Sequence, residues 1–227
     1  MALLIFAVLS LLVAGELQAG VVVGGTRFIF PADRESISIL LTNTSQESWL
    51  INSKINRPTR WAEASTVPAP LLAAPPLILL KPGTTGTLRL LRTESDILPV
   101  DRETLFELSI ASVPSGKVEN QSVKVAMRSV FKLFWRPEGL PGDPLEAYQQ
   151  LRWTRNSQGV QLTNPTPYYI NLIQVSVNGK ALSNVGVVPP KSQRQTSWCQ
   201  AIAPCHVAWR AINDYGGLSA KKEQNLP

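Results

Sequence analysis

Residues 121–137 have the sequence QSVKVAMRSVFKLFWRP, and this segment decides the fold class. In its first half, Val123, Val125 and Met127 alternate with polar or small residues. This two-residue period is typical of a β-strand with one apolar face. The apolar row either faces the core of its own domain or serves in pairing with another molecule. The segment therefore predicts a long β-strand, and its pattern alone leaves both uses open.

The second half of the segment, from residue 131 to 136, is almost continuously apolar but contains Lys132 and Arg136. A continuous apolar run is usual for a strand that is buried on both faces. An unpaired cation in such a strand would carry a large desolvation cost. We therefore predict that both cations have partners, and that the strand offers more apolar and cationic surface than one small sandwich needs. Such a strand is suited to pair with another molecule.

The rest of the chain consists of short strand patterns and turns. It has 227 residues with 18 prolines and 14 glycines, and segments rich in Val, Ile, Leu and Thr recur along it. Their number and spacing before residue 137 are typical of an immunoglobulin-like sandwich. Residues 137–144, PEGLPGDP, have the composition of a linker, and strand patterns resume after them. We predict an all-β chain with an N-terminal domain (20–137), a linker (138–144) and a smaller C-terminal β-sandwich domain (145–227).

The first 19 residues, MALLIFAVLSLLVAGELQA, form an apolar run that ends in the small residue Ala19. This pattern predicts a secretory signal peptide over residues 1–19, although no Lys or Arg precedes the apolar run. A transmembrane anchor is the alternative, but a span needs about 20 apolar residues and Glu16 interrupts this run. We predict an exported protein with no stable membrane insertion.

The two cysteines, Cys199 and Cys205, fit export. They are too far apart for a CxxC redox motif, and the chain lacks the further Cys and His ligands of a zinc site. Exported proteins oxidise such pairs, so a short structural disulfide is expected. Two free buried thiols are the alternative.

The charge of the chain does not indicate a nucleic-acid partner. The formal net charge is +6, but the cations are scattered, and only Lys221 and Lys222 form a dense local cluster. Dispersed positive charge on an exported chain favours solubility and acidic partners. We therefore expect no nucleic-acid binding.

A search for catalytic motifs finds little. The chain has no GxSxG elbow, HExxH pair, P-loop or GxGxxG motif. Its single histidine, His206, is interpreted as an ordinary strand or turn residue. Asp101 and Glu103 have the spacing of a carboxylate pair, but Arg102 between them favours ion pairing over acid–base chemistry. We predict that the protein is not an enzyme and uses no metal or other cofactor.

Six motifs follow one another along the chain: Thr26-Arg27, Pro75-Pro76, LPVDRETLF at 98–106, KLFWRP at 132–137, NPTPYY at 164–169 and INDYGG at 212–217. Together they resemble the periplasmic chaperones of the chaperone/usher pathway, and the resemblance covers nearly the whole mature chain. It implies two immunoglobulin-like domains in a boomerang arrangement. It also implies a periplasmic chaperone that stabilises pilus subunits by donor-strand complementation and delivers them to an outer-membrane usher.

The resemblance further implies roles for individual residues. Arg27 and Lys132 match the cleft cations that bind the C-terminal carboxylate of a pilus subunit. Val123, Val125 and Met127 match the apolar row that fills the groove of a subunit lacking its last strand.

The resemblance also implies an ion network at the domain interface, made by Glu103, Arg136 and Asp214. The chain departs from the family pattern at Trp135, where Tyr is usual, and in its cysteine pair, which precedes the INDYGG motif. The short loop over residues 114–121 resembles that of the subclass serving rigid, rod-like pili.

Two alternative functions stay open: a pilus subunit or adhesin, and an exported β-sandwich hydrolase.

The spacing of the proposed functional residues raises a question about the strand itself. Met127 and Lys132 differ in parity, so a regular pleat would point them to opposite faces of the sheet. Either twist or a bulge near Ser129 and Val130 rotates the strand, or the carboxylate approaches Lys132 from the side.

Overall fold

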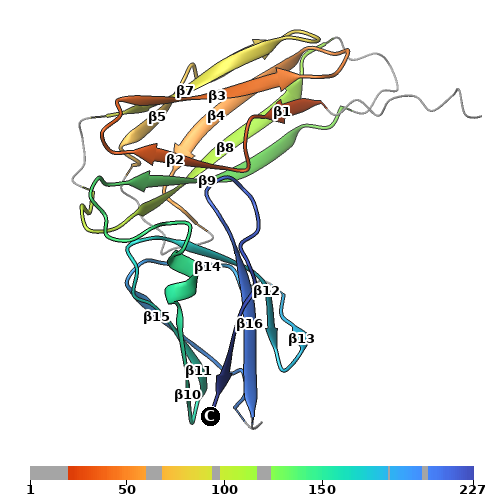
Figure 1. Ribbon diagram of the computed structural model, residues 1–227. Helices are drawn as coiled ribbons and strands as arrows, with labels where there is room; N and C mark the ends of the chain where they lie inside the picture. Colours follow the sequence, from red (N-terminus) through yellow and green to blue (C-terminus); the bar gives the residue numbers. More distant parts are fainter. Residues whose placement is uncertain (1–19, 60–67, 94–97, 117–123, 184, 201–203) are drawn as a thin grey trace, which may run out of the picture.

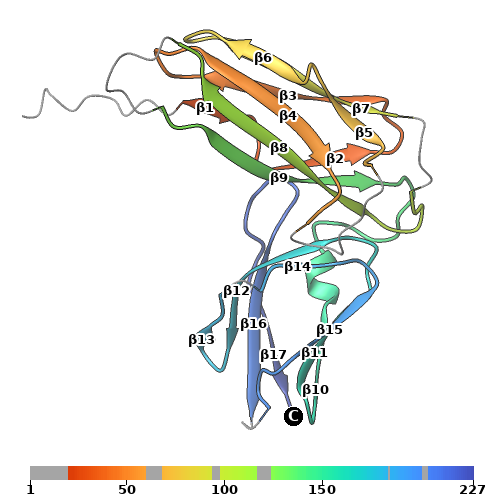
Figure 2. The same cartoon turned by 180° about the vertical axis from the view of Figure 1, so that it is seen from behind.

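The computed structural model describes residues 20–59, 68–93, 98–116, 124–183, 185–200 and 204–227. These residues form two β-sandwiches that meet at an angle, as Figure 1 shows from one side and Figure 2 from behind. The predicted all-β architecture with two sandwich domains is confirmed. The predicted signal peptide, residues 1–19, lies outside the described residues. None of the helical segments described is long and apolar enough to cross a membrane.

The N-terminal sandwich pairs a four-stranded sheet, in the order β1-β3-β7-β5, with a five-stranded sheet, in the order β2-β9-β8-β4-β6. Alternate apolar side chains of both sheets form its core, in which Phe30, Leu41, Leu88 and Phe106 are fully buried. Its strands are β1 (Val21–Val23), β2 (Arg27–Pro31), β3 (Ser36–Asn43), β4 (Trp49–Asn56), β5 (Leu71–Ala74), β6 (Leu77–Leu80), β7 (Thr85–Arg92), β8 (Thr104–Pro114) and β9 (Met127–Arg136).

The chain changes sheets between β1 and β2, and this change determines how much of β9 is covered. β1 pairs with β3 in the four-stranded sheet, whereas β2 runs parallel to β9 in the other sheet. Gly24 and Gly25 make the crossing, and the Gly24 amide donates to the carbonyl oxygen of Leu40 at 2.9 Å. Because β2 begins only at Arg27, it pairs with β9 only from Lys132 onward.

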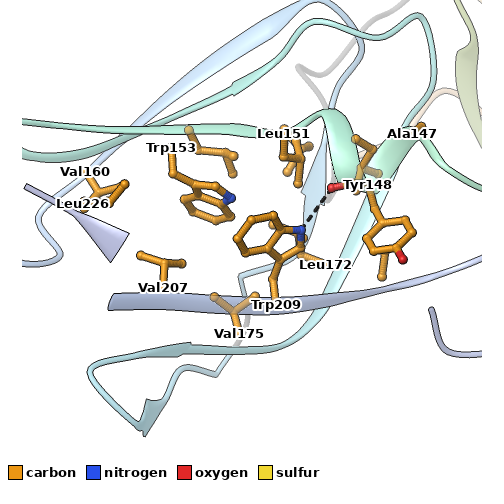
Figure 3. Packing of buried hydrophobic residues seen from close by; sticks show 14 of the residues in the cluster. Ala147, Tyr148, Leu151, Trp153, Val160, Leu172, Val175, Val207, Trp209 and Leu226 are labelled. Atoms are coloured by element: carbon orange, nitrogen blue, oxygen red, sulfur yellow. Dashed lines mark hydrogen bonds between the residues drawn. The ribbon is translucent and has the colours of Figure 1, made fainter. Parts of the chain in front are cut away.

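The C-terminal sandwich has one sheet in the order β10-β11-β15 and a second in the order β13-β12-β16-β17, with β14 also pairing with β12. Its core surrounds Trp153 and Trp209, whose ring centroids are 5.2 Å apart, and Trp209 Nε1 donates to the carbonyl oxygen of Tyr148 (Figure 3). Its elements are η1 (Ala147–Gln150), β10 (Arg152–Asn156), β11 (Gly159–Asn164), β12 (Ile170–Val177), β13 (Lys180–Ala181), β14 (Val187–Val188), β15 (Ser192–Thr196), β16 (Cys205–Ile212) and β17 (Lys222–Leu226).

The predicted disulfide is confirmed: Cys199 and Cys205 are bonded, with their Cα atoms 5.8 Å apart. Both residues are buried beside the core of the C-terminal sandwich. The alternative of two free thiols is therefore wrong. The bond connects the start of β16 to the segment that follows β15.

Candidate functional site

The junction of the two sandwiches contains the two cations assigned to the cleft. Arg27 on β2 and Lys132 on β9 are direct partners across the parallel strands, so their side chains leave the same face of the sheet as neighbours. Both residues are half-buried. Burial lowers the pKa of Lys132, and the positive charge of Arg27 lowers it further. Two adjacent, partly desolvated cations create a site that favours an anion.

The guanidinium group of Arg27 is held by the C-terminal sandwich. Its Nη1 donates hydrogen bonds to the carbonyl oxygens of Ile212, at 2.5 Å, and Asn213, at 2.7 Å. Its Cζ lies 5.4 Å from the centroid of the Phe134 ring. Within the described part of the chain, Nε and Nη2 of Arg27 have no hydrogen-bond partner. These N–H groups leave the guanidinium able to donate to a carboxylate.

Arg136, the second cation of the strand, lies between one acid from each sandwich. Its Nε donates to Glu103 Oε1 at 2.7 Å, and its Nη1 donates to Asp214 Oδ2 at 2.7 Å. Burial by itself lowers the pKa of Arg136, but the hydrogen bond to Asp214 and the charge of Glu103 raise it overall. The three residues assigned to an interdomain ion network are thus in direct contact, and they join the end of β9 to the segment after β16.

Glu103 is the most buried member of this group, with a side chain that is 2% exposed. Its Oε2 accepts a hydrogen bond from the backbone N–H of Tyr169 at 2.7 Å, and its own backbone N–H donates to the carbonyl oxygen of Pro167. Burial raises the pKa of Glu103, while Arg136 and the Tyr169 N–H act in the opposite direction. Glu103 therefore connects the N-terminal sandwich to the NPTPYY motif as well as to Arg136.

A second ion pair between the sandwiches was not foreseen from the sequence. Lys191 Nζ lies 2.6 Å from Asp101 Oδ2, and Arg102 also binds this carboxylate, at 2.9 Å. The hydrogen bonds from Arg102 and Lys191 lower the pKa of Asp101. The predicted ion pairing of Asp101 with Arg102 is present, but Asp101 and Lys191 are 90 positions apart and no local pattern connects them.

The residues assigned to the apolar row are only partly described. Val123 lies outside the described residues. Val125 precedes β9 and is not in a strand, so the prediction that the strand includes it is wrong. Its side chain is 64% exposed, and that of Met127, the first residue of β9, is 53% exposed. The alternative that Val125 and Met127 pack in the core of their own domain is therefore wrong. Met127 leaves β9 on the same face as Leu133 and Trp135, but this end of the strand extends beyond the stretch that β2 covers and stays exposed.

The strand between Met127 and Lys132 contains no bulge. β8 and β9 pair without a register shift from Met127 to Trp135, so of the three explanations left open the bulge near Ser129 and Val130 is wrong. Leu133 and Trp135 enter the core of the N-terminal sandwich, and by alternation Lys132 belongs to the opposite face, which meets the second sandwich. Met127 and Lys132 thus have opposite parities on one regularly paired strand.

The N-terminal half of β9 has one edge without a strand partner in the described structure. β8 pairs with β9 from Met127 to Trp135, but β2 pairs only with Lys132 to Arg136. The backbone from Met127 to Phe131 is therefore open on the side away from β8. An edge of this kind is able to accept a further strand.

His206 lies beside an acidic residue of the neighbouring strand, β17. Its Nε2 lies 3.8 Å from Glu223 Oε2, at the outer surface of β16. Among the described residues there is no group of three or more His, Cys, Asp or Glu side chains that could hold a metal ion.

Comparison with known proteins identifies the family. Residues 20–141 match the family described as "Pili and flagellar-assembly chaperone, PapD N-terminal domain", and residues 146–223 match "Pili assembly chaperone PapD, C-terminal domain". The chain is 99% identical to the fimbrial chaperone YcbF of Escherichia coli K12, over 100% of the chain and 97% of that protein. It is 33% identical to the chaperone protein FimC of the same strain, over 94% of the chain and 87% of that protein.

Solved structures agree with this assignment. The crystal structure of the YadV chaperone matches 92% of the chain and 100% of its own length, at 29% identity and a TM-score of 0.76. A chain in the structure of the Salmonella enterica SafA pilin in complex with the SafB chaperone covers 93% of this chain and 98% of its own, at 30% identity and a TM-score of 0.78. With both sandwiches matched in order, the chain belongs to the PapD-like family of pilus-assembly chaperones.

Proposed function

We propose that this chaperone binds a pilus subunit through the subunit's C-terminal carboxylate and through a strand added to the open edge of β9. One observation carries the proposal: the paired cations Arg27 and Lys132 lie where the open edge ends. An anchor for a chain terminus thus directly adjoins a site for an extended segment.

The anchor would fix the terminal residue of the subunit. The Arg27 guanidinium and the Lys132 ammonium are able to donate short, charge-assisted hydrogen bonds to a carboxylate. Because the terminus is fixed, every residue before it meets a defined position on β9, and the register of the added strand follows. The added segment would run from the Met127 end toward Lys132, in the direction of β9 itself, so the pairing would be parallel.

The apolar row would then complete the subunit's fold. Met127 and Val125 project exposed apolar side chains beside the open edge, and Val123 continues the row in sequence. Burying each of them in an incomplete sandwich would contribute about 1.5 to 3 kcal/mol. The opposite parities of Met127 and Lys132 fit two separate tasks, since the row would contact the subunit's core while the anchor would face the cleft.

The cellular context follows from this role. We infer that the protein works in the periplasm, delivers subunits to an outer-membrane usher and acts without catalysis or a cofactor. The family matches over residues 20–141 and 146–223 support domain boundaries at 20–137 and 145–227. The ion network of Glu103, Arg136 and Asp214 would set the angle at which the two domains frame the cleft.

Co-expression with the products of neighbouring genes tests the proposal. The wild-type chaperone should recover a subunit in a pull-down, and Arg27→Ala and Lys132→Ala should remain folded but lose it. Loss of one charge-assisted hydrogen bond of about 1.5 to 3 kcal/mol predicts binding that is weaker by about 10- to 150-fold. Arg152→Ala, which removes an exposed cation on β10, is the matched control. Wild-type subunit yield with both cleft variants would refute the anchor.

A further inference from the structure

We infer that Tyr215, in the loop between β16 and β17, is a further contact for the bound subunit and packs against its C-terminal residues. The inference rests on the proposed function and extends it to a residue of the second sandwich. Tyr215 is 87% exposed, more than any other large apolar or aromatic side chain among the described residues.

The loop that carries Tyr215 is rigidly built. Asn213 Oδ1 accepts the backbone N–H groups of Tyr215, at 3.1 Å, and Gly217, at 2.8 Å. The Gly216 N–H donates to the carbonyl oxygen of Asn213 at 3.0 Å. Gly216 has φ +82°, a conformation that glycine adopts without strain. These bonds fix the backbone on both sides of Tyr215 while its ring remains in solvent.

The same loop is fastened to the N-terminal sandwich. Arg27 donates to the carbonyl oxygens of Ile212 and Asn213, and Asp214 binds Arg136. A Cβ atom on Gly216 would lie 2.7 Å from Thr26 Oγ1, so the loop rests directly against the residue before β2. In Figure 1 this loop reaches from the end of β16 up to β9.

This position puts the loop beside the end of the proposed subunit strand. The open edge of β9 ends where β2 begins, at Arg27, and a strand added to that edge would end at the same point. Thr26 and Arg27 contact the loop that carries Tyr215. The last residues of the subunit would therefore lie next to the loop, within reach of its exposed Tyr215 ring.

An exposed aromatic ring on a fixed loop has the properties of a binding contact. Tyrosine provides a large apolar area with few rotatable bonds, so little conformational entropy is lost when its ring is covered. Because its backbone is already ordered, binding would not have to order the loop. The partner chemistry that fits is an apolar or aromatic side chain at or near the subunit's C-terminus.

Dissociation of the purified chaperone–subunit complex tests the inference, with an excess of differently tagged chaperone to capture released subunit. Tyr215→Ala should release the subunit about tenfold faster than wild type, which corresponds to about 1.4 kcal/mol. Tyr215→Phe keeps the ring and should stay within about twofold of the wild-type rate. Leu72→Ala removes an exposed apolar side chain from β5, in the other sheet, and should have no effect.

The possible results separate the two proposals. A wild-type release rate for Tyr215→Ala, together with subunit loss in Arg27→Ala and Lys132→Ala, would overturn the role of Tyr215 and leave the proposed function standing. Undiminished subunit binding in all three variants would overturn the carboxylate anchor itself. Because Tyr215 makes no buried contact, its variants should match wild type in urea unfolding, and a destabilised Tyr215→Ala would show that the ring has a structural role instead.

Discussion

Replacing Glu103 by Ala should destabilise the chaperone more than any substitution of an exposed acid. The change removes the carboxylate that accepts from Arg136 and from the Tyr169 N–H, both at 2.7 Å. Breaking a buried ion pair by removing one partner costs about 3 to 5 kcal/mol. Since Arg136 keeps its contact with Asp214, we expect a loss near the lower limit, about 3 kcal/mol. Glu103→Gln keeps an acceptor of similar shape and should lose about half as much.

Urea unfolding followed by tryptophan fluorescence measures these losses. Both sandwiches contain tryptophans, among them Trp135 and Trp153, so fluorescence reports the unfolding of each domain. If the substitution lets the two sandwiches unfold independently, two transitions should replace one. Glu138→Ala, which replaces an exposed acid shortly after β9, is the matched control and should stay within about 0.5 kcal/mol of wild type. Since Glu103 and Asp214 share Arg136, the effects of Glu103→Gln and Asp214→Asn should not be additive. A Glu103→Ala protein as stable as the control would refute the claim that this carboxylate joins the sandwiches.

Three further predictions concern the apolar row, the disulfide and the exposed ion pair. Met127→Glu should leave the circular dichroism spectrum unchanged, because Met127 is exposed, and should lower the yield of co-purified subunit. Loss of folding would show instead that Met127 stabilises the chaperone's own core. Cys205→Ser should lower the free energy of unfolding by about 2 kcal/mol in the chain-entropy account of a short loop, and a stability equal to wild type would contradict that account. The lowered pKa of Asp101 means that its stabilising contribution is present above the unfolded pKa of about 3.9 and is lost as pH falls below it. Asp101→Asn should therefore reduce the acid sensitivity of unfolding, and identical pH profiles would argue against the Asp101–Lys191 contact.

The sequence predicted the site better than it predicted the limits of the strands around it. Arg27, Lys132, Glu103, Arg136 and Asp214 were assigned from motifs, and the structure brings all of them to the junction of the sandwiches. The long strand, in contrast, is predicted from the pattern of residues 121–137, whereas β9 begins at Met127. Alternation of apolar residues indicates a strand with one apolar face, but it does not indicate where the strand begins. β9 begins where its pairing with β8 begins, and the sequence around residue 127 does not encode that pairing.

Two strands and one ion pair lacked a local signal. β17, with the sequence KEQNL, has a single buried residue, Leu226, and owes its conformation to pairing with β16. β5, with the sequence LLAA, is only four residues long and lies in a proline-rich stretch. The contact between Asp101 and Lys191 depends on how the two sandwiches are placed, which no short window of sequence encodes.

Because Arg27 contacts the second sandwich and would also bind the subunit, these two interactions would be thermodynamically linked. One nitrogen of its guanidinium already holds the second sandwich, and the remaining N–H groups would hold the cargo. A bound subunit that orients this side chain would strengthen the contact between the two sandwiches. By thermodynamic reciprocity, any change that weakens this contact would lower the affinity for the subunit by the same factor. A chaperone of this design would become stiffer when loaded, so a receptor could distinguish loaded from empty molecules by their rigidity as well as by their surface.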